Sequence, residues 1–191
     1  MSNRLTPQRL LAAYSQGAFP MDVGGAIRWF SPDPRGILPL DKFHVSKTLG
    51  QLWRQRRFDI RCDVRFRDVM LACSQRAEGT WISEDIVEAY CRLHELGHAH
   101  SVEAWCGDEL AGGLYGVALG GAFFGESMFH RRRDASKIAL VALVERLRRG
   151  GFTLLDVQYC TAHLKRFGVI EIPRRLYLQR LAAALRIRAS F

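Results

Sequence analysis

A stretch of helical periodicity between two strand-like runs constrains the fold of this chain most. Residues 121–128 form a run of aromatic and small residues, and residues 153–158 are rich in β-forming residues. Between them, Asp134 is placed to cap a helix that Gly150 ends in a left-handed turn. The apolar positions of this helix fall on one face, at Ile138, Val141, Val144 and Leu147. The order strand, helix, strand predicts one crossover unit.

A hairpin precedes this unit. Residues 100–105 and 110–117 read as strands, and residues 106–109 form a turn between them. Three antiparallel strands, a helix and a fourth strand are the order of an acetyltransferase-like (GNAT-type) fold. We therefore predict an α/β (α+β) mixed sheet with flanking helices, which opens a cleft where two neighbouring strands splay. The usual acyl-CoA loop is absent, because Phe129-His130-Arg131-Arg132-Arg133-Asp134-Ala135 stands in its place, and no cofactor is expected.

Capping residues predict further helices in the first half of the chain. Thr6, Ser46 and Ser83 are placed to cap helices that end at about residues 17, 56 and 96. Another helix is expected over residues 64–73, and a strand over residues 58–62.

The length of 191 residues predicts one core, or one core with a small appendage. Residues 18–21 and 29–35 are rich in proline and are expected to be irregular. We therefore divide the chain into a small N-terminal subdomain, residues 1–35, and a GNAT-like domain, residues 36–191.

Cysteine usage and hydropathy bear on the cellular compartment. The five cysteines are odd in number and form no Cys-x-x-Cys pair, so neither a disulfide framework nor a zinc ribbon is expected. The chain does not open with a secretory signal, and its longest uncharged run, residues 111–125, is too short to span a bilayer. We expect a cytoplasmic protein with no membrane partner.

One short motif resembles a metal site. His94-Glu95-Leu96-Gly97-His98 matches the H-E-x-x-H pattern of zinc proteases, which needs both histidines on one face of a continuing helix. Gly97 falls inside the motif, and a strand begins at about His98. A helix-to-strand corner is therefore expected, and no metal site.

The excess of positive charge is confined to the C-terminal part. From residue 131 onward there are 14 Lys and Arg against four Asp and Glu, whereas residues 1–130 carry 14 against 15. Such asymmetry favours a polyanionic partner, RNA or DNA ahead of a membrane. Three arginines directly before the helix at residue 135 could bind phosphate at its N-terminus, or could form a solvated charge run.

Two polar residues end the last predicted strand. Alternation places Asp156 and Gln158 on one face, next to residues 123–128, where they could flank a cleft. A satisfied pair at a sheet edge is the alternative.

Short blocks in a fixed order run through most of the chain, from about Leu10 to Leu178. They are Ala18-Phe19-Pro20, Trp29-Phe30-Ser31-Pro32-Asp33-Pro34-Arg35, Glu78-Gly79-Thr80-Trp81-Ile82, Leu93-His94-Glu95-Leu96-Gly97-His98-Ala99-His100-Ser101, Gly113-Leu114-Tyr115-Gly116-Val117, Phe124-Gly125-Glu126-Ser127-Met128-Phe129, Ala135-Ser136-Lys137 and Glu171-Ile172-Pro173-Arg174-Arg175. Through these blocks the chain resembles leucyl/phenylalanyl-tRNA–protein transferases.

The resemblance implies transfer of Leu or Phe from aminoacyl-tRNA to the α-amino group of proteins that begin with Arg or Lys, which creates an N-terminal degradation signal. By position, the family's catalytic Asp-x-Gln pair falls on Asp156 and Gln158. Its amino-acid pocket falls on Leu114, Phe123, Glu126, Met128, Leu143, Leu147 and Leu155.

Aromatic residues are expected at the acceptor end of the tRNA. The resemblance places the adenosine-contacting tryptophan on Trp81, and Met21 stands where the family has a second tryptophan. Trp29 and Phe30 could stack on a base in its place, or could seal the edge of the core.

The chemistry of these residues fits that reaction. An aminoacyl ester is already activated, and an α-amine, with a pKa of about 7.7–8.0, is partly unprotonated at neutral pH. No catalytic Ser or Cys is required. We assign Gln158 to orient the amine, and Asp156 to hold Gln158 and attract the developing ammonium. An apolar pocket would admit Leu, Phe and also Met, and a basic acceptor requires an acid, for which Glu126 and Asp156 are the candidates.

Basic residues in the C-terminal part are expected to bind tRNA phosphates. The candidates are Arg131, Arg132, Arg133, Lys137, Lys165, Arg166, Arg174 and Arg175. The expected partners are aminoacyl-tRNA and protein substrates, acted on by a monomer. Two alternatives remain, a related tRNA-dependent transferase that acts on N-terminal Asp or Glu, and a non-catalytic RNA-binding module.

Overall fold

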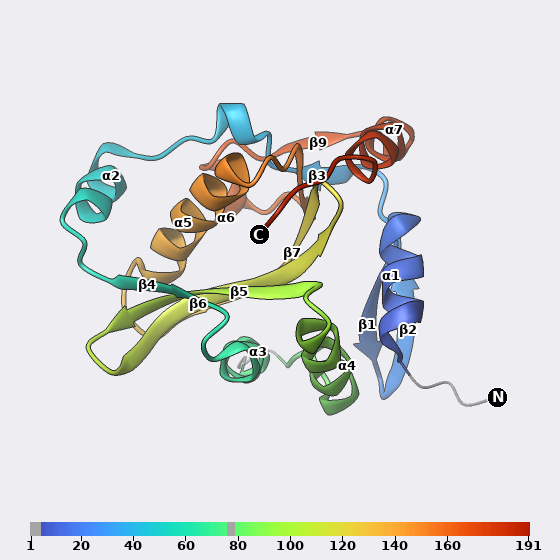
Figure 1. Ribbon diagram of the computed structural model, residues 1–191, viewed down its shortest axis with the longest axis horizontal. Coiled ribbons are helices and arrows are strands. Elements are labelled where there is room, and N and C mark those ends of the chain that lie inside the picture. Colours follow the sequence, from blue (N-terminus) through green and yellow to red (C-terminus); the bar gives the residue numbers. More distant parts are fainter. Residues whose placement is uncertain (1–4, 76–78) are drawn as a thin grey trace.

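The computed structural model describes residues 5–75 and 79–191, so residues 1–4 of the predicted subdomain and Glu78 of one sequence block lie outside it. Helices and strands follow one another as Figure 1 shows. They are α1 (Pro7–Ser15), β1 (Phe19–Val23), β2 (Ala26–Phe30), β3 (Arg35–Ile37), a 3₁₀ turn (Leu40–Lys42), α2 (Lys47–Arg54), β4 (Asp59–Cys62), α3 (Phe66–Ser74), α4 (Glu84–Glu95), β5 (Ala99–Cys106), β6 (Glu109–Leu119), β7 (Ala122–His130), α5 (Ala135–Arg149), β8 (Leu154–Gln158), α6 (Ala162–Lys165), β9 (Ile170–Ile172) and α7 (Arg174–Ala184).

Seven strands form one mixed sheet in the order β4-β5-β6-β7-β8-β3-β9. β5, β6 and β7 are antiparallel neighbours, and β8 runs parallel to β7 after the crossover through α5. α5 packs on one face of β5 and β6, whereas α3 and α4 lie on the other face (Figure 1). The predicted GNAT-like mixed sheet with flanking helices is confirmed.

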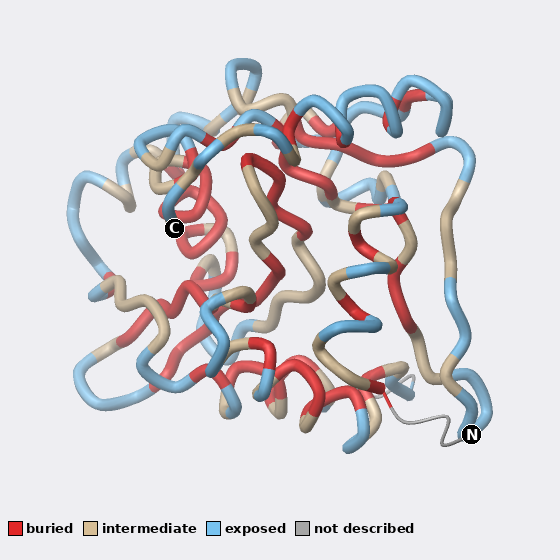
Figure 2. Tube along the Cα trace, turned by 45° about the vertical axis from the view of Figure 1, so that its right-hand side comes forward, coloured by how far each residue is buried: buried red, intermediate tan, exposed pale blue. Residues whose placement is uncertain are grey.

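The core is divided between the two faces of the sheet. Phe123 and Leu155 point into the cluster under α5, whereas their neighbours Phe124 and Leu154 belong to the cluster under α1, α3 and α4. This division follows from the alternation of side chains along a strand. Buried residues accordingly run along the central strands and the inner sides of the helices (Figure 2).

The segment predicted to be irregular contains three strands. β1 and β2 form an antiparallel hairpin. Gly24 and Gly25 make its turn with φ of 65° and 82°, as a two-residue turn of type I′ requires. β3 joins the main sheet between β8 and β9. The prediction of irregular structure was therefore wrong for residues 19–21, 29–30 and 35, which lie in strands, and the Gly-Gly turn signal at residues 24–25 was missed. The boundary between residues 35 and 36 stays a prediction.

The predicted helix caps differ in their outcome. The hydroxyls of Thr6 and Ser46 each accept a hydrogen bond from the backbone N–H three residues on, at 3.3 Å, which confirms both caps. Asp134 takes the capping position of α5 in a left-handed conformation, with φ of 70°. Its carboxylate makes no capping bond and instead accepts from Lys137 Nζ at 2.6 Å.

Two further helix ends correct the sequence predictions. Ser83 precedes α4, but its hydroxyl makes no capping bond, and its Oγ is buried without a hydrogen-bond partner in the described part of the chain. Gly150, predicted to end α5 in a left-handed turn, still has helical dihedral angles. The residue in the left-handed conformation is the next one, Gly151, with φ of 79°.

The H-E-x-x-H motif is divided between two elements. α4 ends at Glu95, and Gly97, with φ of 76°, turns the chain toward β5, so the predicted corner is confirmed. The His94 ring stacks on Phe66 with its centroid 4.4 Å away. Within residues 5–75 and 79–191, no three His, Cys, Asp or Glu are placed to hold a metal ion. No helix in those ranges is long and apolar enough to cross a membrane.

Candidate active site

A pocket opens where β7 and β8 separate. Their parallel pairing joins residues 122–124 to residues 154–156, and the described ladder goes no further. Beyond that point the two strands line a hollow of about 300 Å³, within the range of pockets that take small ligands. Its walls are formed by Trp81, Leu114, Tyr115, Gly125, Glu126, Ser127, Met128, Leu140, Leu143, Leu155, Val157, Gln158, Tyr159, Thr161, His163 and Leu164.

Most of the residues predicted for an amino-acid pocket meet in this hollow. They are Leu114, Glu126, Met128, Leu143 and Leu155. Phe123 and Leu147 do not line it, since both are fully buried in the core beneath α5. The family resemblance placed both residues in the pocket, whereas in the structure they pack beneath it, Phe123 from β7 and Leu147 from α5.

The predicted aromatic residues lie in two places. Trp81 lines the pocket, and its backbone carbonyl accepts from the backbone N–H of Asp22 on β1 at 3.1 Å. Trp29 and Phe30 lie on β2 and do not line it. Phe30 packs on the core against Phe19, whereas Trp29 keeps 36% of its surface exposed.

Gln158 lies at the end of the pocket, in a left-handed backbone conformation with φ of 59°. Its backbone N–H donates to Asp156 Oδ1 at 2.9 Å, and its Nε2 donates to Glu126 Oε1 at 3.1 Å. Because the nitrogen of the amide is engaged, its oxygen is left to accept a hydrogen bond. Gln158 can therefore orient a donor, such as an amine, in the pocket.

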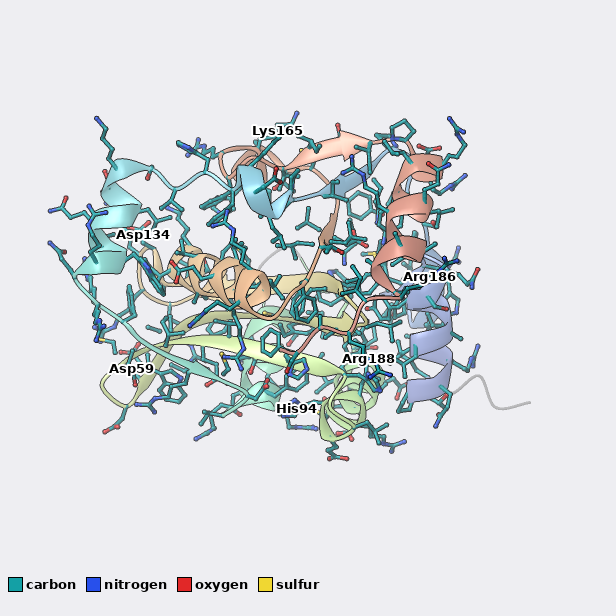
Figure 3. The ribbon with its side chains drawn as sticks, turned by 45° about the horizontal axis from the view of Figure 1, so that its top comes forward. Asp59, His94, Asp134, Lys165, Arg186 and Arg188 are labelled. Atoms are coloured by element: carbon teal, nitrogen blue, oxygen red, sulfur yellow. The ribbon has the colours of Figure 1, made fainter. Side chains whose placement is uncertain are left out.

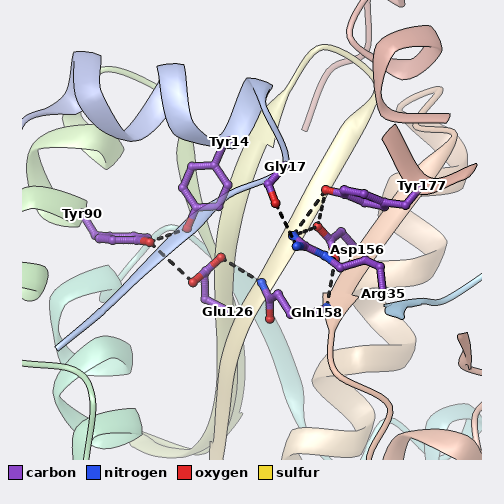
Figure 4. A network of polar contacts seen from close by, with 8 residues as sticks. All are labelled: Tyr14, Gly17, Arg35, Tyr90, Glu126, Asp156, Gln158 and Tyr177. Atoms are coloured by element: carbon purple, nitrogen blue, oxygen red, sulfur yellow. Dashed lines mark hydrogen bonds and ion pairs between the residues drawn. The ribbon is translucent and has the colours of Figure 1, made fainter. Parts of the chain in front are cut away.

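Asp156 is fully buried and does not line the pocket. The expectation that its side chain projects into the cleft beside Gln158 is therefore wrong, since β8 leaves the extended conformation at Gln158. The carboxylate instead accepts from Arg35 Nε and Nη2, at 2.9 Å and 2.7 Å, and from the Tyr177 hydroxyl at 2.7 Å (Figure 4). Asp156 thus reaches the pocket through the backbone of Gln158.

Glu126 connects the pocket to two buried tyrosines. Its Oε2 accepts from the Tyr90 hydroxyl at 3.5 Å, and Tyr90 shares a short hydrogen bond with Tyr14 (Figure 4). Burial raises the pKa of Glu126 to about 8, and the hydrogen bond from Tyr14 offsets part of that effect. Glu126 is therefore largely protonated at neutral pH.

A basic hollow adjoins the apolar pocket. It measures about 520 Å³ and shares Met128 and His163 with the pocket. Arg131, Arg133 and Lys137 contribute cations to its walls. The apolar pocket and the basic hollow lie side by side, and together they suit a ligand with an apolar end and an anionic end.

A second basic hollow, of about 360 Å³, continues the row. It shares Arg133, Lys137 and His163 with the first hollow and adds Arg166. Asp134 also lines it, at the start of α5 beside α2 (Figure 3). Partial desolvation, together with nearby cations such as Lys137, lowers the pKa of His163.

The remaining predicted phosphate-binding residues lie elsewhere. Arg132 is held by Glu109 on the β5–β6 hairpin, with Nε to Oε2 at 3.0 Å. Arg174 donates from Nη1 to the carbonyl of Ser31 at 2.9 Å. Two others are exposed, namely Lys165 (labelled in Figure 3) and Arg175.

Comparison with known proteins identifies the family. The family model described as Leucyl/phenylalanyl-tRNA protein transferase matches residues 37–182, and the model of its N-terminal domain matches residues 3–33. The chain belongs to the leucyl/phenylalanyl-tRNA–protein transferase family. A member from Herpetosiphon aurantiacus is 57% identical over 100% of both chains. Another, from Gloeobacter violaceus, is 55% identical over 98% of this chain and 97% of its own.

Membership of the transferase family confirms the predicted enzyme class, an aminoacyltransferase. Among solved structures, the chain is similar to a conserved protein of unknown function from Staphylococcus epidermidis, with a TM-score of 0.49 and 12% identity over 73% of this chain and 57% of that one. It is also similar to L-PGS from Bacillus licheniformis, with a TM-score of 0.44 and 13% identity over 82% of this chain and 54% of that one.

Sequence reasoning missed several residues of this transferase that shape its site. Arg35 and Tyr177 hold Asp156, and Tyr14 and Tyr90 lie behind Glu126. One signal was present, since an acid inside the apolar run of β8 needs a buried cation. The tyrosines carried no signal, because their positions on α1, α4 and α7 are those of ordinary core residues.

Proposed function

We propose that the protein transfers Leu or Phe from aminoacyl-tRNA to the α-amino group of proteins that begin with Arg or Lys. The carrying observation is the apolar pocket that ends at Gln158 and continues into two basic hollows through Met128 and His163. The amino-acid side chain would occupy the pocket. The phosphates of the acceptor end would lie in the basic hollows, near Arg133 and Lys137.

The pocket supports a preference for unbranched or γ-branched apolar side chains. Leu140, Leu143 and Leu155 offer apolar walls, and the volume of about 300 Å³ suits Leu, Phe and Met. Discrimination by shape alone is modest, since one methylene is worth about 1–3 kcal/mol. Trp81, which also lines the pocket, is proposed to stack on the terminal adenosine.

The reaction requires alignment more than activation. The free amine attacks the ester carbonyl carbon, the C–N bond forms, the C–O bond to the ribose breaks, and the tRNA leaves with a free ribose hydroxyl. The amide oxygen of Gln158 would accept a hydrogen bond from the amine and direct its lone pair at the carbonyl carbon. Holding amine and ester in place can contribute about 7–11 kcal/mol.

Under this proposal, the carboxyl group of Glu126 recognises the basic side chain of the N-terminal Arg or Lys of the protein substrate. Asp156 is already paired with Arg35 and is closed off from the pocket, whereas Glu126 lines it. A cationic side chain beside Glu126 would favour its ionised form and so form an ion pair.

The cellular setting follows from the substrates. Aminoacyl-tRNA is made and used in the cytoplasm, where we place the enzyme. The product would carry an N-terminal Leu or Phe, which would act as a degradation signal. A monomer is proposed.

Radiolabelled Leu-tRNA tests the function directly. We expect label to move to peptides that begin with Arg or Lys, and not to peptides that begin with Asp or Ala. Preference for Asp would favour the related transferase, and binding of Leu-tRNA without transfer would favour a non-catalytic RNA-binding module. Gln158→Ala should abolish most transfer, whereas Gln179→Ala, on the exposed side of α7, should transfer like the parent.

A further inference from the structure

A fully buried arginine lies behind the pocket. Arg35 begins β3 and exposes none of its side chain. Its Nε and Nη2 donate to the two carboxylate oxygens of Asp156, at 2.9 Å and 2.7 Å. Its Nη1 donates to the backbone carbonyl of Gly17 at 2.9 Å. The two-point contact fixes the plane of the carboxylate as well as its position.

Tyr177 closes the other side of this carboxylate. Its hydroxyl donates to Asp156 Oδ2 at 2.7 Å, and its ring centroid lies 4.5 Å from the guanidinium carbon of Arg35. Burial raises the pKa of the Tyr177 phenol above its ordinary value, so the phenol stays protonated and remains a donor. The charge of Asp156 is thus balanced within the fold, and this carboxylate is a poor candidate for a proton acceptor.

The remaining bond of Asp156 reaches the pocket. Oδ1 accepts the backbone N–H of Gln158 at 2.9 Å, and Gln158 has a φ of 59°. Residues with a side chain rarely adopt this left-handed conformation unless their surroundings impose it. The other end of Gln158 is tied to Glu126, with Nε2 donating to Oε1 at 3.1 Å. Without the fixed carboxylate of Asp156, the backbone of Gln158 would be free to leave its left-handed conformation. The side-chain amide oxygen of Gln158 would then no longer be held in one orientation.

We propose that Arg35 and Tyr177 are positioning residues for aminoacyl transfer, which fix Asp156 so that it holds the backbone of Gln158 in its left-handed conformation. The inference rests on the proposed function, because that function gives Gln158 the task of orienting the amine. Neither Arg35 nor Tyr177 lines the pocket. Both therefore act through Asp156 and not on the substrates.

Steady-state kinetics of Tyr177→Phe and Arg35→Lys test this role. Tyr177→Phe removes one donor to Asp156, and Arg35→Lys replaces a two-point contact by a single one. We expect kcat to fall about 10-fold and about 100-fold, since small displacements at a reacting centre have effects of that size. The KM for aminoacyl-tRNA should stay unchanged. Arg67→Lys, in an exposed ion pair with Glu84, is the matched control and should behave like the parent.

The same two substitutions in a Gln158→Ala background show whether they act through Gln158. If they do, they cause no further loss of kcat in that background. Losses that multiply with that of Gln158→Ala would overturn the inference.

A double variant separates positioning from folding. Arg35→Met together with Asp156→Leu removes both buried charges, a replacement that is often neutral or stabilising. We expect a cooperative thermal transition near that of the parent, unchanged binding of aminoacyl-tRNA and loss of most transfer. A folded double variant that transfers at the parental rate refutes the inference. If the parent itself transfers nothing to any peptide, the proposed function fails first, which is a distinct result.

Discussion

Glu126→Gln should remove a pH dependence of stability that the parent protein shows between about pH 5 and pH 8. Burial raises the pKa of Glu126 from an ordinary value near 4.5 to about 8 in the folded protein. Over this interval the folded chain holds a proton that the unfolded chain has lost. Stability from this group is therefore fully present below about pH 4.5 and is lost as the pH rises toward 8.

The size of the effect follows from the pKa difference. Each pH unit between the two pKa values changes the free energy of unfolding by about 1.4 kcal/mol. Three units would give about 4 kcal/mol for a side chain sealed from water. Glu126 is only half-buried, because it lines the pocket. Water there screens the charged form, and about 1–3 kcal/mol is expected.

Urea unfolding at pH 5, 6, 7 and 8 measures this contribution. The quantity of interest is the difference in unfolding free energy between the parent and Glu126→Gln, since other titrating groups cancel in it. The difference should fall from pH 5 to pH 8. Glu95→Gln, at the exposed end of α4, serves as a control with a constant difference. A constant difference for Glu126→Gln as well would mean that Glu126 is ionised in the folded protein and that our reasoning is wrong.

Three further predictions concern the core, the pocket and the basic hollows. Glu103 is fully buried and accepts from two backbone N–H groups at the start of α3, so Glu103→Ala should lower the free energy of unfolding by about 2–4 kcal/mol in urea titrations. Met128→Trp should fill part of the pocket and reduce kcat/KM for Phe-tRNA more than for Leu-tRNA, measured with one acceptor peptide. Arg133→Ala should weaken binding of aminoacyl-tRNA and lower the slope of log K against log salt by about 1, measured by filter binding; an unchanged slope would exclude a phosphate contact at Arg133.

The crossover unit was predictable because its signals are local. The apolar spacing of α5 and the turn between β5 and β6 specify these elements within short stretches of sequence. β3 was not predictable in the same way. It has three residues, Arg35–Ile37, and its pairing depends on strands more than 100 positions away. Short strands that complete a sheet carry little signal of their own.

The residues of the candidate site also differ in whether local sequence signals could predict their positions. Met128, Leu155 and Gln158 lie on β7 and β8, so their meeting follows from the crossover unit and from the family resemblance. The burial of Asp156 did not follow, because it depends on Arg35, 121 positions earlier in the chain. The left-handed backbone of Gln158 was equally hidden, since glutamine has no preference for that conformation.

The place of β3 in the sheet affects how the protein is made. Among the earliest strands to leave the ribosome, it ends up between β8 and β9, which are synthesised last. Until residues 154–172 emerge, Arg35 lacks its partner Asp156, β7 lacks its neighbour β8, and β3 lacks both of its neighbours. Because loop closure over such separations is slow, assembly of the pocket should be a late event in biosynthesis, and a stalled ribosome would display an inactive, aggregation-prone intermediate.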